Sequence, residues 1–296
     1  MTDTPLLTIG LPVYNSERFL AQSLESLLNQ TFRDFRLIIS DNASIDRTAE
    51  ICKDYASRDK RIAYYRNSTN IGLSANFNRV FTLSASKYFK WSTSDDYWAP
   101  TMIEKAVEIM ESDDRIALCY PRTTLVNAAG ENPEPYEDRL HLISDSPRER
   151  FIQLMEQIGL SHQHLGVSRT SMVRRTHMLG AHVGSDINML AELALYGKFY
   201  ELPERLFFRR FHEDSSSWAR RDKQHQARRY HSASSSQIIL TSWRWHLAFF
   251  HAVRGAPITF KDRLSLYQYL VRRMRWDRAR LAQELKTKVS HCWKRD

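Results

Sequence analysis

The chain has 296 residues, of which 42% are hydrophobic and 26% are charged. This composition is typical of a globular protein and argues against a disordered or fibrous chain, and the length allows one large domain or two small ones. The formal net charge of +9 is unevenly placed, because residues 205–296 contain 21 Lys and Arg against 7 Asp and Glu, a net +14, whereas residues 1–204 carry −5. Such a basic region indicates an anionic partner, either nucleic acid or an acidic lipid surface.

Apolar runs of two kinds alternate along the first 125 residues. Short continuous runs predict buried strands, and runs with apolar residues at helical spacing predict helices. The expected strands are 6–11, 35–39, 62–65, 88–91 and 116–120, and the expected helices are 17–29, 48–55, 74–84 and 101–111. This alternation predicts right-handed βαβ crossovers and a mostly parallel central sheet, the α/β class.

The rest of the chain is less regular. Residues 132–146, with two prolines and many charges, are predicted to form a surface loop. We expect helices over 149–157 and 188–196 and strands over 166–173 and 199–202. Residues 260–289 place an apolar stripe that includes Leu264, Val271 and Leu281 near one helical face beside clustered arginines, a basic amphipathic pattern. Such a helix either packs on the domain and solvates its other side, or lies on a membrane.

Cysteine use and hydropathy bear on the compartment. The three cysteines lie far apart without a Cys-x-x-Cys pair, which argues against a disulfide framework or a structural zinc site and favours the cytoplasm. The short polar start at residues 1–5 leads directly into an apolar run, so we expect no signal peptide. The nearest candidate for a membrane span, 238–253, is interrupted by Arg244 and His246, so the chain is predicted not to cross a bilayer.

Polar segments follow the apolar runs in a fixed order. A Pro-Val-Tyr-Asn sequence at 12–15 closes the first run, residues 41–48 close the second, and residues 94–96 followed by Pro100 close a later one. An isolated acid, Asp186, comes much further along. Acids placed just after strands lie at the carboxyl edge of an open α/β sheet, where such sheets bind ligands. The order therefore predicts one site assembled from distant loops.

Together with the Asn-Ile-Gly sequence at 70–72, these segments resemble the GT-A fold glycosyltransferases of family 2. One segment alone is a weak signal, whereas four in order on the expected strand ends are specific. The resemblance implies a GT-A domain over 1–212, made of a donor-nucleotide half (1–125) and an acceptor half (126–212), followed by a helical basic C-terminal extension over 213–296. The implied reaction moves a sugar from a nucleotide-diphospho-sugar to an acceptor hydroxyl with inversion at the anomeric carbon.

The resemblance also implies where the donor nucleotide binds. A turn fixed by Pro12 can present backbone groups and Tyr14 to the nucleobase. Asp41 resembles the acid that accepts a hydrogen bond from the nucleobase in this family, and a turn or cap role is its alternative reading. The other donor-binding candidates are Asn15, Glu17, Asn70, Gly72, Ser94, Asp95 and Asp96.

A divalent metal, Mg²⁺ or Mn²⁺, is implied because charge accumulates on the diphosphate as the glycosidic bond breaks. Asp95 is the ligand candidate, since it matches the last acid of the family's Asp-x-Asp element. His212 could complete the metal shell, although a lone histidine is more often structural. The chain departs from the family at Thr93 and Asn42, where acids commonly stand, and these departures affect the expected metal dependence more than the expected fold.

Asp186 is the candidate catalytic base, because the family carries an acid that deprotonates the acceptor hydroxyl near a helix start in this part of the chain. An N-cap role is the alternative reading, and both roles are compatible. Arg209 and Arg210 could pair with phosphate oxygens. The His-Gln-His run at 162–164 has metal-like spacing but stands in a predicted loop without acids, so we expect an acceptor-site or surface segment there.

Two other classes of function compete with this reading. A nucleotidyltransferase would carry a glycine-rich phosphate loop after the first strand, and this chain does not. A nucleic-acid- or membrane-binding protein with a degenerate, inactive GT-A domain would use the basic C-terminal region. We expect no nucleic acid, and prefer peripheral docking on the anionic inner face of the cell membrane, because enzymes that act on lipid-linked or polysaccharide acceptors of the cell envelope need it.

Overall fold

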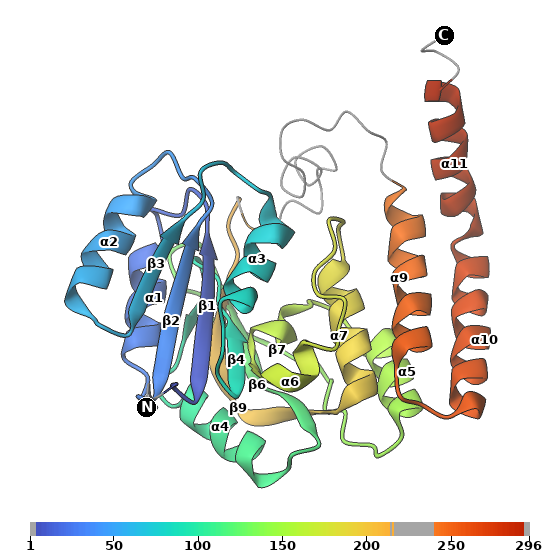
Figure 1. The fold of residues 1–296 in the computed structure, drawn as a ribbon, viewed down its shortest axis with the longest axis horizontal. Coiled ribbons are helices and arrows are strands. Elements are labelled where there is room, and N and C mark those ends of the chain that lie inside the picture. Colours follow the sequence, from blue (N-terminus) through green and yellow to red (C-terminus); the bar gives the residue numbers. More distant parts are fainter. Residues whose placement is uncertain (1–3, 214, 216–239, 293–296) are drawn as a thin grey trace.

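The computed structural model describes residues 4–213, 215 and 240–292. Within these residues one sheet forms the centre of an α/β unit, and three helices stand beside it (Figure 1). The strands are β1 (Leu7–Val13), β2 (Phe35–Asp41), β3 (Ile62–Arg66), β4 (Tyr88–Trp91), β5 (Tyr97–Trp98), β6 (Ile116–Val126), β7 (Glu134–Tyr136), β8 (Val167–Arg169) and β9 (Lys198–Arg210). Their order is β3-β2-β1-β4-β8-β6-β9-β5, and β7 pairs with β6.

Most of the paired residues in this sheet run parallel. Strands β3, β2, β1 and β4 are parallel neighbours, as are β6 and β9, whereas β8 is antiparallel to both β4 and β6. The predicted α/β class with a mostly parallel sheet is therefore confirmed. The strand predicted over 166–173 is only half right, because the chain turns into helix α6 (Thr170–Val173) after β8. Thr170 and Val173 are both buried, and a spacing of three residues places them on one face of a helical turn.

Helices cover the sheet and connect most of its strands (Figure 1). The helices of the α/β unit are α1 (Leu20–Leu28), α2 (Thr48–Arg58), α3 (Leu73–Thr82), α4 (Met102–Ser112), α5 (Pro147–Gln157), the 3₁₀ helix η1 (His162–Leu165) and α7 (Ser185–Tyr196). Leu20, Leu24 and Leu27 of α1 are fully buried, as their helical spacing predicts.

One strand predicted for the second half of the chain is present but longer than expected, and the predicted surface loop is wrong in part. The strand predicted over 199–202 is β9, which continues to Arg210 because it pairs with β6 along its length. Residues 132–146 are not a surface loop throughout, since they contain β7 and bury Leu140 and Leu142 completely. Both differences come from long-range pairing with β6, which no local pattern encodes.

The basic region after residue 240 forms α9 (Thr241–Gly255), α10 (Phe260–Trp276) and α11 (Arg278–Cys292). The single amphipathic helix predicted over 260–289 is therefore wrong, because the chain breaks at Asp277, the C-cap of α10. α10 packs through Leu266, Tyr269 and Leu270, whereas Leu264 and Val271 of the predicted apolar stripe are exposed.

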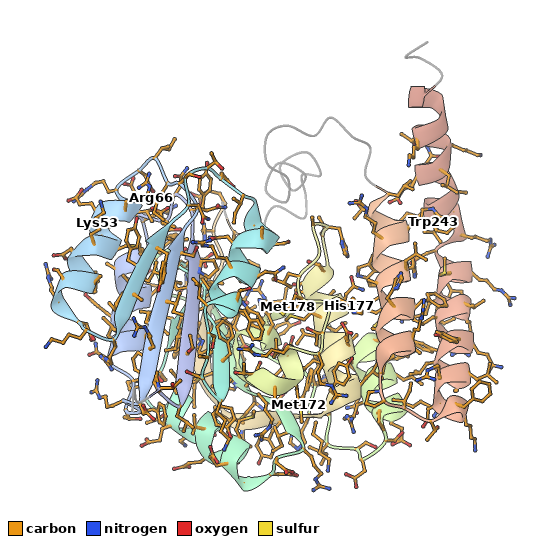
Figure 2. The ribbon with its side chains drawn as sticks, viewed as in Figure 1. Lys53, Arg66, Met172, His177, Met178 and Trp243 are labelled. Carbon is orange, nitrogen blue, oxygen red and sulfur yellow. The ribbon has the colours of Figure 1, made fainter. Side chains whose placement is uncertain are left out.

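α11 is held to α9 by the indole of Trp243, which donates to the Leu281 carbonyl at 3.0 Å (Figure 2). Leu281 is buried at this contact, so this part of the predicted stripe packs inward. Within the described ranges, no helix is both long enough and apolar enough to span a bilayer.

Candidate active site

The carboxyl ends of β1 and β2 lead into two loops that bind each other. The Asn15 amide donates to Ser44 Oγ at 3.0 Å, and Asn15 Oδ1 accepts from the Ile45 amide at 3.0 Å. Glu17 reaches the same loop, since its carboxylate accepts from the Arg47 amide at 3.0 Å. Asn15 adopts a left-handed backbone with φ 48°, a conformation that Asn tolerates better than most residues. Asn15 and Glu17 thus fix the relative position of two loops at the sheet edge.

Pro12 does not form a turn, in contrast to the sequence expectation. It is buried within β1 opposite Ser40 of β2, and the pairing of β1 with β4 ends two residues earlier, at Gly10. The missing N–H of Pro12 therefore costs no ladder bond on the β4 side. Tyr14 follows the strand and is 46% exposed, so its ring is available at the rim of the site.

Asp41 ends β2 and is completely buried. One carboxylate oxygen accepts from the Ser44 amide at 2.8 Å, and the other accepts from the Tyr64 hydroxyl at 2.8 Å and pairs with Arg66 at 3.2 Å (Figure 2). The carboxylate therefore has the turn role that was its alternative reading. A nucleobase N–H can reach it only by displacing Tyr64 or Arg66, and Arg66, 43% exposed, is the partner that can move.

Asn42 explains one departure from the family pattern. Its side-chain amide donates to Asn70 Oδ1 at 2.8 Å, while its carbonyl oxygen accepts from the Ile71 amide at 2.9 Å. Asn70 Oδ1 also accepts from the amide of Gly72, whose φ of 89° favours glycine. A carboxylate at position 42 could not donate to Asn70, so the amide suits this network.

The two metal candidates of the sequence lie together. Asp95 Oδ2 is 3.1 Å from Nε2 of His212, although 117 residues separate them. His212 is 8% exposed, and its other ring nitrogen is buried with no hydrogen-bond partner in the part of the chain that the structure describes. Burial raises the pKa of Asp95, but the hydrogen bond from His212 and its charge outweigh burial, so the pKa is lowered overall. Ser94 joins this loop to the β1 loop through a 2.8 Å contact with Ser16.

Asp96 and Arg210 hold the loop in place from within the protein. The Asp96 carboxylate accepts from the Thr93 hydroxyl at 2.7 Å and from the Arg210 amide at 2.8 Å. Burial and then the charge of Asp95 raise the pKa of Asp96 to about 7. The buried Arg210 guanidinium donates to the Asp95 carbonyl at 2.9 Å. Thr93, Asp96 and Arg210 thus anchor the loop that carries Asp95 to the end of β9.

Sequence reasoning missed Lys90, a cation within the apolar strand β4. It is completely buried, with its ammonium nitrogen 3.1 Å from the Trp91 carbonyl and 3.8 Å from the ring centre of Trp98. Burial lowers the pKa of Lys90 well below its ordinary value. A lysine inside a strand that is otherwise aromatic was the signal that could have identified it.

Asp186 lies in the first turn of α7, but the N-cap is Gly184, so the capping role does not apply. The Ser161 hydroxyl donates to the Asp186 carboxylate. Ser161 immediately precedes η1, where His164 is partly buried and hydrogen-bonded to the Ser161 carbonyl at 2.6 Å. The carboxylate of Asp186 is therefore held by the segment that carries the His-Gln-His run.

That run was predicted to be an acceptor-site or surface segment without acids, and the surface alternative is wrong. His162 is buried and lies 2.7 Å from the Asp138 carboxylate, and its other ring nitrogen lies 2.9 Å from the Arg209 guanidinium. Burial lowers the pKa of His164, and the charge of Asp186 opposes this effect. Arg209 and Asp186 are thus both held by η1 and the residue before it.

An α/β sheet with polar loops and an Asp–His pair at its carboxyl edge is the arrangement expected of the GT-A class. The sequence model of Glycosyl transferase family 2 matches residues 8–177, more than half of the chain, and the chain belongs to this family. An uncharacterized glycosyltransferase of Methanocaldococcus jannaschii is 32% identical over 142 residues, and the putative glycosyltransferase EpsE of Bacillus subtilis is 36% identical over 112. These matches cover 46% and 38% of this chain and 49% and 40% of the relatives, so the chain aligns with about half or less of their length.

Solved structures share the fold at low sequence identity. S. aureus TarS 1-349 in complex with UDP superposes with a TM-score of 0.66 and 12% identity, over 90% of this chain and 71% of that chain. The mannosyltransferase PcManGT from Pyrobaculum calidifontis, in complex with GDP-Man and Mn²⁺, gives a TM-score of 0.55 and 14% identity, over 100% and 89%. These likenesses establish the GT-A fold of the chain.

Proposed function

We propose that this glycosyltransferase moves a sugar from a nucleotide-diphospho-sugar to an acceptor hydroxyl, with inversion at the anomeric carbon. The observation that carries the proposal is the 3.1 Å Asp95–His212 pair at the carboxyl edge of the sheet. Arg209 contacts His162 of η1, and Asp186 is held by Ser161, the residue before η1, so the candidate base and the candidate phosphate ligand share one support. The structural neighbours support the class of donor, since TarS was solved in complex with UDP and with UDP-GlcNAc and PcManGT in complex with GDP-Man.

We assign the donor nucleotide to the loops after β1, β2 and β3. The exposed ring of Tyr14 would cover the nucleobase, and Asp41 would accept from it once Arg66 moves aside. The remaining contacts would come from the same loops and from the loop after β4: Asn15, Glu17, Asn70, Gly72, Ser94 and Asp95. Pro12 and Asp96 are buried and would support these loops from within.

The residues present fit a divalent cation that binds together with the diphosphate. Among the described residues no three His, Cys, Asp or Glu side chains form a metal site by themselves. Asp95 and His212 offer one carboxylate and one imidazole whose second nitrogen is unpartnered, and Mg²⁺ or Mn²⁺ often combines few protein ligands with substrate phosphates. When bound, the cation would neutralise charge on the departing diphosphate.

Asp186 would act as the base. Its carboxylate, oriented by Ser161, takes the proton of the acceptor hydroxyl while the hydroxyl oxygen attacks the anomeric carbon. The bond from that carbon to the diphosphate oxygen breaks on the opposite face, so the configuration inverts. The domain division at residues 125 and 212 belongs to this proposal, with 1–125 binding the donor and 126–212 facing the acceptor.

We propose further that the C-terminal region docks on an anionic membrane from the cytoplasmic side, where a saccharide or lipid-linked acceptor would be reached. Support comes from the outer side of α10, where Phe260 is 77% exposed and Trp276 67% exposed, with Arg272 and Arg275 exposed nearby. Exposed aromatic side chains beside arginines suit the interface of an acidic bilayer. Residues 216–239 of the predicted extension lie outside the described residues.

A panel of UDP- and GDP-sugars tests the proposed function. Each donor is incubated with the protein and Mg²⁺ or Mn²⁺, with a mixture of saccharide and lipid-linked acceptors, and the released nucleoside diphosphate is measured beside donor binding. We expect one nucleotide class to bind and to release its diphosphate faster with acceptor than without. Absence of binding across the panel, with the protein folded, would contradict the proposal.

A further inference from the structure

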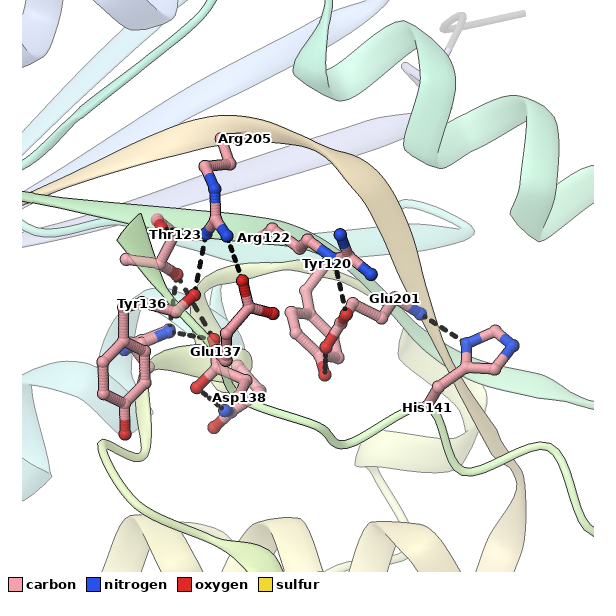
Figure 3. A network of polar contacts seen from close by, with 11 residues as sticks. Tyr120, Arg122, Thr123, Tyr136, Glu137, Asp138, His141, Glu201 and Arg205 are labelled. Carbon is pink, nitrogen blue, oxygen red and sulfur yellow. Dashed lines mark hydrogen bonds and ion pairs between the residues drawn. The ribbon is translucent and has the colours of Figure 1, made fainter. Parts of the chain in front are cut away.

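The segment after β7 contains a buried carboxylate, that of Asp138, next to η1. Asp138 is 2% exposed and accepts from the Gln163 side chain at 2.6 Å. Figure 3 shows how this segment is fastened to β6, because the Arg205 guanidinium donates to the Thr123 carbonyl at 2.7 Å and to the Tyr136 carbonyl at 2.8 Å. Asp138 is therefore fixed in position before any ligand binds.

His162 links the fixed carboxylate of Asp138 to Arg209 by hydrogen bonds. A guanidinium has only donors, so the 2.9 Å contact with Arg209 makes His162 Nδ1 an acceptor and places the ring proton on Nε2. Nε2 in turn lies 2.7 Å from Asp138 Oδ2 and 2.7 Å from the Thr123 hydroxyl. The three side chains form a chain of hydrogen bonds from a buried carboxylate, through a buried imidazole, to a partly exposed arginine.

The position of Arg209 indicates what this chain of hydrogen bonds can orient. Side chains alternate along a strand, so Arg209 points away from Arg210, which anchors the loop of Asp95 from within. Arg209 also stands three residues before His212, whose ring lies 3.1 Å from Asp95 Oδ2, so Arg209 lies at the end of β9 next to the proposed diphosphate position. A guanidinium carries five N–H donors and can serve His162 and a phosphate group at once.

We propose that the Asp138–His162 pair is a positioning device that aims the Arg209 guanidinium at the diphosphate of the donor. The inference rests on the proposed function. Arginine side chains lose about 2 kcal/mol of rotamer freedom when they are fixed, so an anchor that orients the group in advance strengthens its contact with phosphate. In this assignment Arg209 touches the substrate, whereas His162 and Asp138 act through it.

The test compares ligands with and without the second phosphate. Titration calorimetry in the presence of Mn²⁺ measures the affinity of the wild type for UDP and UMP and for GDP and GMP. The variants are then measured with the uridine or the guanosine pair, whichever the wild type binds more tightly. His162→Leu, which is similar in volume, removes both the donor for Asp138 and the acceptor for Arg209. We expect it to weaken diphosphate binding about tenfold, the scale of one charge-assisted contact, and monophosphate binding less than about threefold. In an Arg209→Ala background the same substitution should cause no further loss.

A matched control separates positioning from general destabilisation. His246 is another buried histidine paired with an acid, Asp277 at 2.9 Å, in the helical region. His246→Leu should lower thermal stability without changing the ratio of diphosphate to monophosphate affinity. If His162→Leu does not fold, Asp138→Asn, which conserves volume, replaces it with the same expected change in ratio.

The outcomes distinguish the two levels of the proposal. Two results would overturn the positioning role and leave the proposed function standing. One is an unchanged ratio of diphosphate to monophosphate affinity in the folded His162 or Asp138 variant. The other is a further loss of diphosphate affinity when Arg209 is already alanine. A wild-type protein that binds neither UDP nor GDP with Mn²⁺ would overturn the proposed function and this inference with it.

Discussion

Asp186 is the residue on which the proposed chemistry depends most. Asp186→Asn keeps an oxygen that can accept from Ser161 but removes the base, so we expect transfer to fall by ~10²-fold or more while nucleoside diphosphate affinity stays nearly unchanged. The measurement is the rate of diphosphate release at saturating donor and acceptor, beside calorimetric donor binding.

Ser161→Ala is the matched control for this prediction. It leaves the carboxylate in place but removes the hydroxyl that orients it, so its loss of rate should be smaller than that of Asp186→Asn. If Asp186→Asn instead loses donor affinity but still turns over the donor that remains bound, Asp186 is a nucleotide-binding or structural residue and not the base.

Lys90 gives a prediction about stability. Its pKa in the folded chain lies well below the ordinary 10.5, so the unfolded chain binds the extra proton, and the contribution of Lys90 to the free energy of unfolding rises with pH up to about 10.5. Lys90→Met removes this dependence. We therefore expect the variant to be more stable than the wild type, with the largest difference in the free energy of unfolding at the lowest pH. This gap should shrink by up to about 1.4 kcal/mol per pH unit as the pH rises towards 10.5.

Urea unfolding at several pH values between 7 and 10 measures this gap. The exposed Lys53 of α2 is the control position, because Lys53→Met should show a gap that does not vary with pH. A constant gap for Lys90→Met as well would mean that Lys90 is charged in the folded protein.

Among the elements, those with a local periodic pattern were predicted well. Strand β4 has the predicted bounds, and the predicted helix over 149–157 lies within α5. The length of β9 could not be predicted, because its continuation to Arg210 depends on pairing with β6. The burial of His162 could not be predicted either, since its partner Asp138 stands 24 residues away in a segment that reads as a polar loop.

α10 carries the prediction of membrane binding. Arg272→Glu with Arg275→Glu should weaken binding of the full chain to phosphatidylglycerol-containing vesicles by tenfold or more, since each basic residue near an acidic surface contributes about 1 kcal/mol. Both side chains are exposed, so the fold should persist. Vesicle sedimentation at low and high salt measures the effect, and salt should weaken wild-type binding.

Lys53→Glu with Arg58→Glu makes the same change in net charge on α2, at the far side of the molecule from α10 (Figures 1 and 2). This control should bind vesicles more tightly than the α10 variant. Equal binding by both variants would show that only the net charge matters, and the docking role of α10 would then be wrong.

At the scale of the whole molecule, the order of polar segments along the chain predicted which loops meet. The loop of Asn15 contacts the loop of Ser44, and Asp95 meets His212, because parallel strands bring their carboxyl ends to one edge. The sequence could not show how that edge is supported from below. Asp96, Arg210 and Lys90 lie in the interior, where burial changes the chemistry of a side chain without leaving a local pattern.

The central claim is that Asp95 and His212 bind a nucleoside diphosphate together with a divalent cation. The most direct measurement is calorimetric binding of UDP and GDP to the wild type and to Asp95→Asn, with Mn²⁺ and with a chelator. The side chain of Asp95 contacts His212 while its carbonyl accepts from Arg210, so the variant should keep the fold. We predict that one nucleotide binds the wild type at least ~10-fold more tightly with Mn²⁺ and that Asp95→Asn abolishes this difference. Wild-type affinity that is indifferent to Mn²⁺, or full Mn²⁺ dependence in Asp95→Asn, would contradict the account.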